Sequence, residues 1–528
     1  MAPLMPRSPG LLLLAALGAG VFVVGAELMV TAVALPQILA DLADWTELRR
    51  ASWIINGYLV AYVAVMPLAG RAADRYPLPL LFGLSLAVFA VGSVLSGAAA
   101  DLDQLIAARV FQGLGAGAIV PLATAGASHL FEGPARARAI GVIGALTFLG
   151  MAAGPFLGAI ILQTIRLPDA GLLGPSWRWV FYLGAPIAVL AGLYNWAAAP
   201  SWRTLRGSGG LDVLGAVLFT AAVAAGLLGL TVIGDWLLTS ALAVVAMAAV
   251  LLILALIRFR RADSPFLELH HFRDRTFAGA VLLSLLTGYA LATAIVGAAV
   301  FVDRVRYGGP DEQQLALGGL AAAMAVGALG SGFILRAMGI LLPSVAGLVL
   351  AVAGLLLAAS ARPESEMAVL VAGLALFGFG FGVTVTARST AAVEALGRRA
   401  FGVASAGVTV ARMVGMGIGL AALTVFGSNR IEALSVVLVD QQARDAVLPP
   451  GLRGRQLEDY LVVEALERWA SSEASGILAT LFVVAAAVTA IAIVPTLAMR
   501  NRPAAEAQWT KHEVGDALDD GPGAGVGV

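Results

Sequence analysis

The chain has 528 residues, of which 60% are hydrophobic and 12% are charged, and its acidic and basic residues balance to a formal net charge of zero. Soluble domains are about half apolar and about a quarter charged, so this composition predicts a polytopic membrane protein. The chain has no cysteine, which excludes disulfides and thiolate metal sites, and its single lysine, Lys511, excludes a phosphate-binding loop that ends in Lys-Ser or Lys-Thr.

Apolar runs long enough to cross a membrane recur along the whole chain. Crossing about 30 Å of hydrocarbon takes about 20 helical residues. The first run follows Arg7 and continues past Glu27 to Leu35, which is longer than the apolar region of a signal peptide, so we expect an uncleaved first helix. The sequence predicts fourteen spans: 11–35, 53–70, 79–99, 104–130, 138–163, 178–198, 211–233, 238–258, 277–302, 314–336, 341–360, 367–391, 402–427 and 476–498.

The distribution of arginine predicts the orientation of these spans. An even number of spans places both termini on one side, and basic residues gather in short cytoplasmic loops. The side of the termini holds Arg71, Arg75, Arg136, Arg138, Arg203, Arg206, Arg258, Arg260, Arg261, Arg273, Arg275, Arg336, Arg398, Arg399, Arg500, Arg502 and Lys511. The opposite short loops hold Arg49, Arg50, Arg166, Arg178, Arg304, Arg306 and Arg362. We therefore expect both termini in the cytoplasm and the chain in a bacterial inner membrane.

The spans divide into two sets of six with two further spans between them. We expect an all-α fold with an N-terminal six-helix lobe at 1–200, a two-helix insert at 201–262 and a C-terminal six-helix lobe at 263–500. A weak repeat supports this division, because the loops after the second and tenth spans begin at Gly70 and Gly332. Proteins with parallel repeats of this kind bind substrate near mid-membrane, between the halves.

The longest stretch without a span is 428–475, which we expect on the periplasmic side. Apolar residues lie near helical spacing on both sides of Pro449–Gly451: Ile431, Leu434 and Leu438 before it, and Leu457, Leu461 and Trp469 after it. This pattern predicts two helical arms, each about 25–30 Å long at 1.5 Å per residue, with an irregular loop as the alternative. The tail at 501–528 has too few apolar residues to form a core, so we expect it to be disordered in the cytoplasm.

A charged turn, GRAADR at 70–75, separates the second and third spans. It resembles the signature loop of the major facilitator superfamily, Gly-x-x-x-Asp-Arg, and departs from it where Pro77 follows in place of the second basic cluster. The resemblance implies a conformational latch made of Gly70, Arg71, Asp74 and Arg75. Since the basic half of the pattern is weakened, Asp74 must find its partners in Arg71, Arg75 or another helix.

Span four carries RVFQG at 109–113, which resembles the Arg-x-x-Gln-Gly motif of the same superfamily. Arg109 is always charged and stands inside an apolar run, so it needs a carboxylate, a carbonyl or cavity water as a partner. The alternative is that Arg109 extends to the outer membrane interface.

Span five carries GMAAGPFLG at 150–158, which resembles a motif of antiporter members. Glycines four residues apart at Gly150, Gly154 and Gly158 make a flat face for another helix, and Pro155 adds a bend. The pairs Gly113 and Gly117, Gly378 and Gly382, and Gly415 and Gly419 repeat this spacing. Together with the motif around Pro155, they favour an exporter of the antiporter type.

Span one carries ELMVTAVALP at 27–36, which resembles a motif of fourteen-span drug:proton antiporters, with Glu27 in place of aspartate. A carboxyl that faced lipid would be costly, so we expect Glu27 to face the cavity and to exchange protons there. In span thirteen, Arg412 lies near mid-membrane, and we expect it to pair with Glu27 across the two lobes in one conformation. The alternatives are a structural Glu27–Arg109 pair and a partner for Arg412 within its own lobe.

The chain most resembles the mycobacterial lipid-exporting facilitators, through the segment from Trp53 to Ala72 and the segment from Gly402 to Met416. That group carries a glutamate in span five where this sequence has Phe148. We expect Gln112, Phe148 and Met416 to line the cavity. The resemblance implies a hydrophobic substrate such as a triacylglyceride or a lipophilic drug, exported with protons, and a possible periplasmic lipoprotein acceptor.

Other classes of function find little support in the sequence. Neither a net charge nor a basic tract with aromatics indicates a nucleic-acid partner. His129, His270 and His271 have no companion ligands at metal spacing, so we expect neither a metal nor a cofactor. Since ATP-binding and nucleophile motifs are absent, we expect a transporter powered by an ion gradient rather than an enzyme. We also expect a monomer. The alternatives are multidrug efflux with no lipid role and a non-transporting membrane receptor or scaffold.

Overall fold

The computed structural model describes residues 9–42, 50, 53–165, 175–198, 212–231, 238–262, 265, 268–397, 400–455 and 459–499. Every regular element within these ranges is a helix, so the prediction of an all-α fold is confirmed. The predicted tail at 501–528 lies outside them. The N-terminal helices are α1 (Pro9–Leu42), α3 (Trp53–Ala73), α4 (Leu78–Ala98), α5 (Leu102–Leu130), α6 (Gly133–Thr164), α7 (Ser176–Tyr182) and α8 (Gly184–Ala198).

Two further helices follow, and then a second large set. The pair is α9 (Val213–Thr231) and α10 (Leu238–Arg261). The C-terminal set is η4 (Leu269–Arg273), α11 (Arg275–Val300), η5 (Phe301–Val305), α12 (Pro310–Met338), α13 (Leu341–Ala359), α14 (Met367–Leu396), α15 (Phe401–Val439), α16 (Gln441–Val447), α17 (Tyr460–Ile491) and α18 (Ile493–Leu497).

Thirteen helices of the described chain are long and apolar enough to cross a membrane, and each corresponds to a predicted span. The fourteenth prediction, 211–233, falls on α9, whose apolar part Val213–Gly229 is shorter than a full span. The sixth and fourteenth predicted spans are each divided between two consecutive helices, α7 with α8 and α17 with α18. The polytopic fold is therefore the predicted one.

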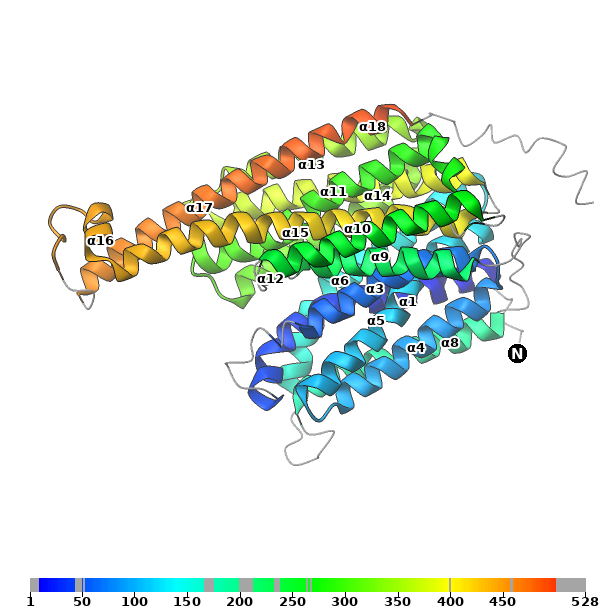
Figure 1. Ribbon diagram of the computed structural model, residues 1–528, viewed down its shortest axis with the longest axis horizontal. Helices are drawn as coiled ribbons and strands as arrows, with labels where there is room; N and C mark the ends of the chain where they lie inside the picture. Colours follow the sequence, from blue (N-terminus) through cyan, green and yellow to red (C-terminus); the bar gives the residue numbers. More distant parts are fainter. Residues whose placement is uncertain are drawn as a thin grey trace, which may run out of the picture.

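The helices gather into an N-terminal group, α1 and α3–α8, and a C-terminal group, α11–α18 (Figure 1). α9 and α10 pack on each other, and α9 also contacts α3 and α15. Contacts of α6 with α12 and of α15 with α3 and α5 join the two groups. The interface between the groups is therefore built from helices of both halves of the sequence. The domain boundaries predicted above remain a proposal.

Polar caps and glycines set several helix ends. The carboxylate of Asp101 accepts the Gln104 N–H at 2.8 Å and starts α5, and Asp274 accepts the N–H of Thr276 at 2.8 Å at the start of α11. α14 ends at Gly397, whose φ of 75° lies in the left-handed region that favours glycine. These caps lie in the loops that the charge pattern places between spans.

The glycines of the GMAAGPFLG motif lie against α1. A Cβ atom at Gly154 would come within 2.6 Å of a carbonyl oxygen of α1, one at Gly158 within 2.9 Å of a valine side chain, and one at Gly150 would overlap a second α1 carbonyl. Pro155 lies within α6 between them. The motif thus lets α6 approach the backbone of α1 closely.

The other three glycine pairs behave in the same way. Gly113 and Gly117 lie against α3, Gly378 and Gly382 against α12, and Gly415 and Gly419 against α11. In each case a Cβ atom would meet a backbone carbonyl of the facing helix. All four sets pack helices of one group together, so each group is held together by close backbone contacts.

α15 and α17 extend beyond the other helices and are joined there by α16 (Figure 1). At 39 residues, α15 is about 58 Å long at 1.5 Å per residue, far more than a membrane crossing needs. Val437, Leu448, Val462 and Leu466 form a small core between these helices. We call the part of α15 beyond Ser428, α16 and the first turns of α17 the extension, and the opposite end of the bundle, at Asp74, the latch end.

The register of the apolar stripe in the extension differs from the prediction. Trp469 packs against the small core, but Leu461 is exposed, while its neighbours Val462 and Leu466 are buried. The reason is that the core is shared with α16, which the sequence pattern did not define. Leu457 and the side chains of Ile431, Leu434 and Leu438 lie outside the described part of the chain.

Candidate functional site

Glu27 and Arg109 form a buried ion pair inside the N-terminal group. Arg109 Nη1 lies 2.7 Å from Glu27 Oε1, and the two side chains are 1% and 3% exposed. Glu27 comes from the middle of α1 and Arg109 from the first half of α5. Arg109 therefore does not reach out to the membrane surface, and its partner is a carboxylate of the same group.

Neutral groups complete the surroundings of Arg109. Its Nε donates to the Ile54 carbonyl oxygen at 3.3 Å, and its Nη1 donates to Gln112 Oε1 at 2.6 Å. The Gln112 amide donates in turn to Ser93 Oγ at 2.7 Å. The guanidinium lies 4.2 Å above the ring of Tyr58, which adds a cation–π contact.

Gln112 therefore belongs to this buried polar cluster, with no exposed surface, rather than to the wall of an open cavity. Sequence reasoning missed Ser93 and Tyr58, because neutral polar residues are common in membrane helices and their spacing gave no signal. The cluster can hold one negative charge in a dry environment. A buried ion pair that loses one partner leaves an uncompensated charge, at a cost of about 3–5 kcal/mol.

Arg412 lies in α15 and is 9% exposed. It makes no ion pair with Glu27 in this conformation, in which the partner of Glu27 is Arg109. The Nε atom of Arg412 is buried and has no hydrogen-bond partner among the described residues. Its helix contacts α3, so the N-terminal group lies close to it. The predicted pair across the groups is thus not formed here.

Arg388 is a second buried cation, which sequence reasoning missed. It lies in α14, is 2% exposed, and donates from Nη1 to the hydroxyl of Thr287 on α11. Its guanidinium lies 5.2 Å from the centre of the Phe381 ring. A Cβ atom at Gly288, next to Thr287, would overlap the backbone carbonyl of Arg412, so Arg412 lies close to the partner of Arg388. The sequence signal was weak, because Arg388 stands near the predicted end of its span.

Phe148 and Met416, predicted to line the cavity, lie in a shared hydrophobic cluster. Phe148 of α6 is buried, and its ring meets that of Phe381 edge-on at 6.1 Å. Met416 is half-buried and packs on the same cluster. Both residues therefore lie where the two groups meet, close to the two arginines.

The predicted latch residue Asp74 binds the start of a helix from the other group. Its carboxylate accepts the N–H of Gly402 at 2.7 Å and of Val403 at 3.0 Å, at the N-terminus of α15. Burial raises the pKa of Asp74 to about 7, against the lowering effect of these N–H donors and of Arg71 and Arg75. Asp74 therefore finds its main partners in another helix, one of the three predicted options.

The other latch residues complete this contact. Arg71 donates from Nη2 to the Pro265 carbonyl oxygen at 2.9 Å, and the same atom lies 3.5 Å from Glu268 Oε1. A Cβ atom at Gly70 would lie 2.6 Å from the Gly402 carbonyl oxygen, so the two backbones nearly touch. The latch end of the bundle is closed in this structure.

Aromatic contacts strengthen the same closure. Phe401, the first residue of α15, lies 5.0 Å below the guanidinium of Arg136 and 4.9 Å from the ring of His129. Ser405 donates to the Pro121 carbonyl oxygen at 3.2 Å. The N-terminus of α15 is therefore held by α3, α5 and α6 together.

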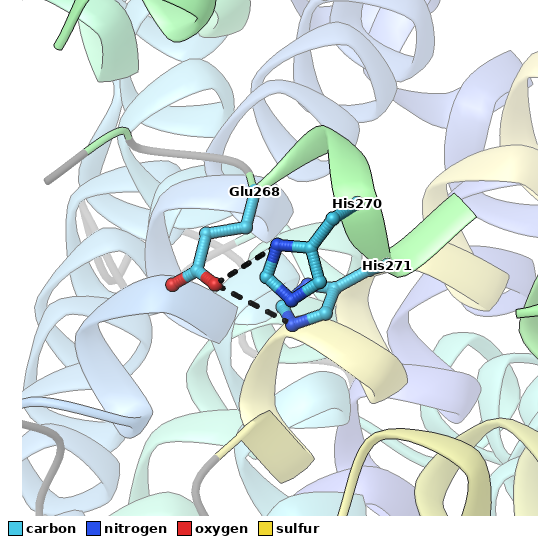
Figure 2. Close-up of side chains that lie close together, drawn as sticks. All are labelled: Glu268, His270 and His271. Atoms are coloured by element: carbon cyan, nitrogen blue, oxygen red, sulfur yellow. Dashed lines mark ion pairs between the residues drawn. The ribbon is translucent and has the colours of Figure 1, made fainter. Parts of the chain in front are cut away.

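Two of the histidines lie beside the latch. Glu268 Oε2 lies 3.5 Å from His270 Nδ1 and 3.7 Å from His271 Nε2 (Figure 2). The expectation that these histidines have no companion ligand is thus wrong, because a 3₁₀ turn brings the carboxylate over them. Burial lowers the pKa of His271. Since Arg71 contacts the same carboxylate, Glu268 already has a cationic partner in the latch.

An apolar groove lies between the two groups, toward the latch end. α3, α9, η4, α11 and α15 contribute to it, so one helix of the central pair forms part of its wall. Its walls are almost entirely apolar, with Arg71 as the charged exception. The lining residues are Pro67, Arg71, Phe219, Phe272, Phe277, Val281, Val403, Ala406, Gly407, Val410 and Ala411.

Known proteins share both the sequence and the architecture. A triacylglyceride transporter of Mycolicibacterium hassiacum is 31% identical over 431 residues, which cover 79% of this chain and 78% of that protein. A triacylglyceride transporter of Mycobacterium tuberculosis H37Rv is 30% identical over 433 residues, covering 76% and 79%.

The structure is also similar to the human organic anion transporter MFSD10, with a TM-score of 0.59 at 15% identity, over 92% of this chain and all of that one. This likeness concerns the fold alone. The family model described as Major Facilitator Superfamily matches residues 17–420. This chain belongs to the Major Facilitator Superfamily of membrane transporters.

Proposed function

We propose that this protein is a proton-coupled exporter, which moves a lipid-like hydrophobic molecule out of the cytoplasm or the inner leaflet by alternating access. Its termini would lie in the cytoplasm and the extension on the outer side of a bacterial inner membrane, as the arginine distribution predicts. The similarity to transporters named for triacylglyceride supports a lipid as the substrate.

The Glu27–Arg109 pair is the observation that carries this proposal. Within the described chain, Glu27 is the only acid buried in the central part of a spanning helix. Carboxylates in such places are expensive and mark proton pathways in transporters. We therefore infer that this carboxylate exchanges protons during transport.

Protonation of Glu27 would cancel one of the two charges that hold α1 and α5 together. Arg109 would then keep only Ile54, Gln112 and the Tyr58 ring as partners. The close backbone contact of α1 with α6 would transmit a shift of α1 to the interface with the C-terminal group. A change of protonation can in this way bias which end of the bundle is closed.

The apolar groove supports a hydrophobic substrate. Its walls provide acyl-chain surface rather than hydrogen-bond partners, and it lies at the closed latch end. A lipophilic drug would fit the same surface, so multidrug efflux is the second candidate function. The extension favours a lipid, because it carries apolar side chains beyond the other helices, on the side where we expect a lipoprotein acceptor.

The test is transport by the purified full-length protein in vesicles with an imposed pH gradient. We expect movement of a fluorescent triacylglyceride to follow the gradient and to stop in Glu27→Gln. Arg336 is exposed, so Arg336→Gln should be as active as the parent. Transport that proceeds equally without a gradient would overturn the coupling. Transport of a cationic dye but of no lipid would favour multidrug efflux.

A further inference from the structure

We propose that Arg388 and Arg412 together form a binding site for the anionic head group of the transported lipid, a phosphate or a carboxylate attached to acyl chains. This inference rests on the proposed function and specifies its substrate class. It departs from a neutral triacylglyceride, which carries no charge for these two cations.

Arg388 and Arg412 differ from the other buried arginines in their hydrogen-bond partners. Arg71, Arg109, Arg136 and Arg178 each have carbonyl or carboxylate oxygens as acceptors. Arg388 has one neutral hydroxyl as its acceptor, and the buried Nε of Arg412 has no hydrogen-bond partner among the described residues. A guanidinium cannot lose its charge in a protein, so its burial is tolerated only with a compensating partner.

The two cations also lie near each other, because the backbone of Arg412 packs on Gly288, next to the Thr287 that binds Arg388. Like charges in a dry interior repel strongly, because the low dielectric screens them little. No ion pair joins either arginine to an acid anywhere in the described chain. A single anion placed between the guanidinium groups would remove both the unpaired charges and the repulsion.

The position of the site fits a transported molecule. Thr287 on α11 and Phe381 on α14 surround Arg388 from the C-terminal group. From the N-terminal group, α3 contacts α15 and Phe148 on α6 packs on Phe381, so both groups meet at the two arginines. A ligand bound here would contact both groups and could respond to their relative movement.

The chemistry of the surroundings narrows the ligand class. Guanidinium groups bind phosphate and carboxylate through two parallel hydrogen bonds. The neighbouring cluster of Phe148, Phe381 and Met416 offers apolar surface for the part of the molecule next to the charge. An anionic amphiphile satisfies both features, whereas a free inorganic anion would use only the first.

The test compares four probes on the purified full-length protein: dioleoyl phosphatidic acid, oleate, triolein and inorganic phosphate. We expect the two anionic amphiphiles to bind at least 10-fold more tightly than triolein. Arg388→Gln and Arg412→Gln should each weaken the binding of the anionic amphiphiles at least 10-fold and leave triolein unchanged. Arg412→Lys keeps the charge and should lose less than Arg412→Gln, and Arg336→Gln is the matched control.

Several outcomes would overturn the inference. Equal affinity for triolein and the anionic lipids would do so, and so would variants that bind all probes like the parent. Tight binding of inorganic phosphate alone would assign the site to a free anion instead of a lipid. Loss of anionic-lipid binding in Glu27→Gln would mean that the arginines act only through Glu27.

The same vesicles separate this inference from the proposed function. If triolein is exported with protons and the arginine variants have no effect, the head-group site is wrong and the exporter stands. If no lipid moves but anionic amphiphiles still bind through Arg388 and Arg412, the site stands and the exporter is wrong. Monodisperse elution and unchanged helical content would show that each variant is folded.

Discussion

The N-terminal and C-terminal groups treat buried charge in opposite ways. In the first, Arg109 meets Glu27 at 2.7 Å and four neutral groups complete the cluster. In the second, Arg388 and Arg412 are also buried but have no acidic partner among the described residues. The N-terminal group is thus self-contained, while the C-terminal group is ready for a negative charge from elsewhere.

The largest effect should come from removing the carboxylate that pairs with Arg109 in the N-terminal group. Glu27→Gln leaves Arg109 buried without a carboxylate, and we expect a loss of about 3–5 kcal/mol in the free energy of unfolding. Thermal unfolding in detergent, with Arg336→Gln as the control, measures it. A variant as stable as the parent would show that Arg109 does not depend on Glu27, and the contrast between the groups would disappear.

The second effect concerns the contact that joins the two groups. Asp74→Ala leaves two buried N–H groups of α15 without an acceptor, and an unsatisfied buried donor costs about 1–3 kcal/mol. We expect the free energy needed to open the latch end to fall by about 2 kcal/mol. Since the chain has no cysteine, a single cysteine placed near Gly402 reports this opening through its rate of labelling. Unchanged labelling would contradict the latch.

The same contact should depend on pH in a defined direction. The pKa of Asp74 is raised to about 7 when it is buried and would return to its ordinary value of 3.8 when the latch opens. The closed end therefore binds the proton more tightly and is most stable below pH 4. Its stability falls as the pH rises toward 7 and is constant above that. Labelling should follow this trend in the parent and lose it in Asp74→Asn.

A third effect tests whether transport needs α1, which carries Glu27, to be packed closely on α6. A Cβ atom at Gly150 would overlap a carbonyl of α1, and overpacking of this kind costs about 1–3 kcal/mol. We expect Gly150→Ala to lose about 1.5 kcal/mol and part of its transport. Gly330→Ala is the matched control, because a Cβ atom there meets nothing within 4 Å. Equal behaviour of the two variants would contradict this.

The smallest effect has the opposite sign. Replacing an uncompensated buried cation by an apolar side chain of similar length removes a desolvation cost, so we expect Arg388→Met to gain about 1 kcal/mol in stability without ligand. Anionic lipid should raise the unfolding temperature of the parent and not that of Arg388→Met. A loss of stability in Arg388→Met would mean that Arg388 is compensated in the free protein.

The sequence predicts the fold well because nearly every spanning helix is visible as one continuous apolar run of matching length. Glu27 and Arg109 could be found for the same reason, since a charge inside such a run stands out. Their pairing could not be derived, because 82 residues separate them and Arg412 was an equally good partner by depth.

The features of the site that the sequence did not predict depend on contacts between residues far apart in the chain. The partners of Asp74 are backbone groups 328 and 329 residues away, which no local pattern encodes. Arg388 escaped notice because an arginine three residues from the end of a predicted span is expected at the membrane surface. The structure instead continues α14 to Leu396 and places Arg388 well inside it.

α15 connects the latch and the extension as one uninterrupted rod. It begins at Phe401, beside Asp74, passes Arg412 after 11 residues and continues for 27 more to Val439. At 1.5 Å per residue, these segments measure about 17 Å and about 40 Å. If the rod pivots near Arg412, it acts as a lever, and a displacement of about 3 Å at its inner end swings the tip by about 7 Å. Ligand binding at the pivot would then move the extension on the far side of the membrane.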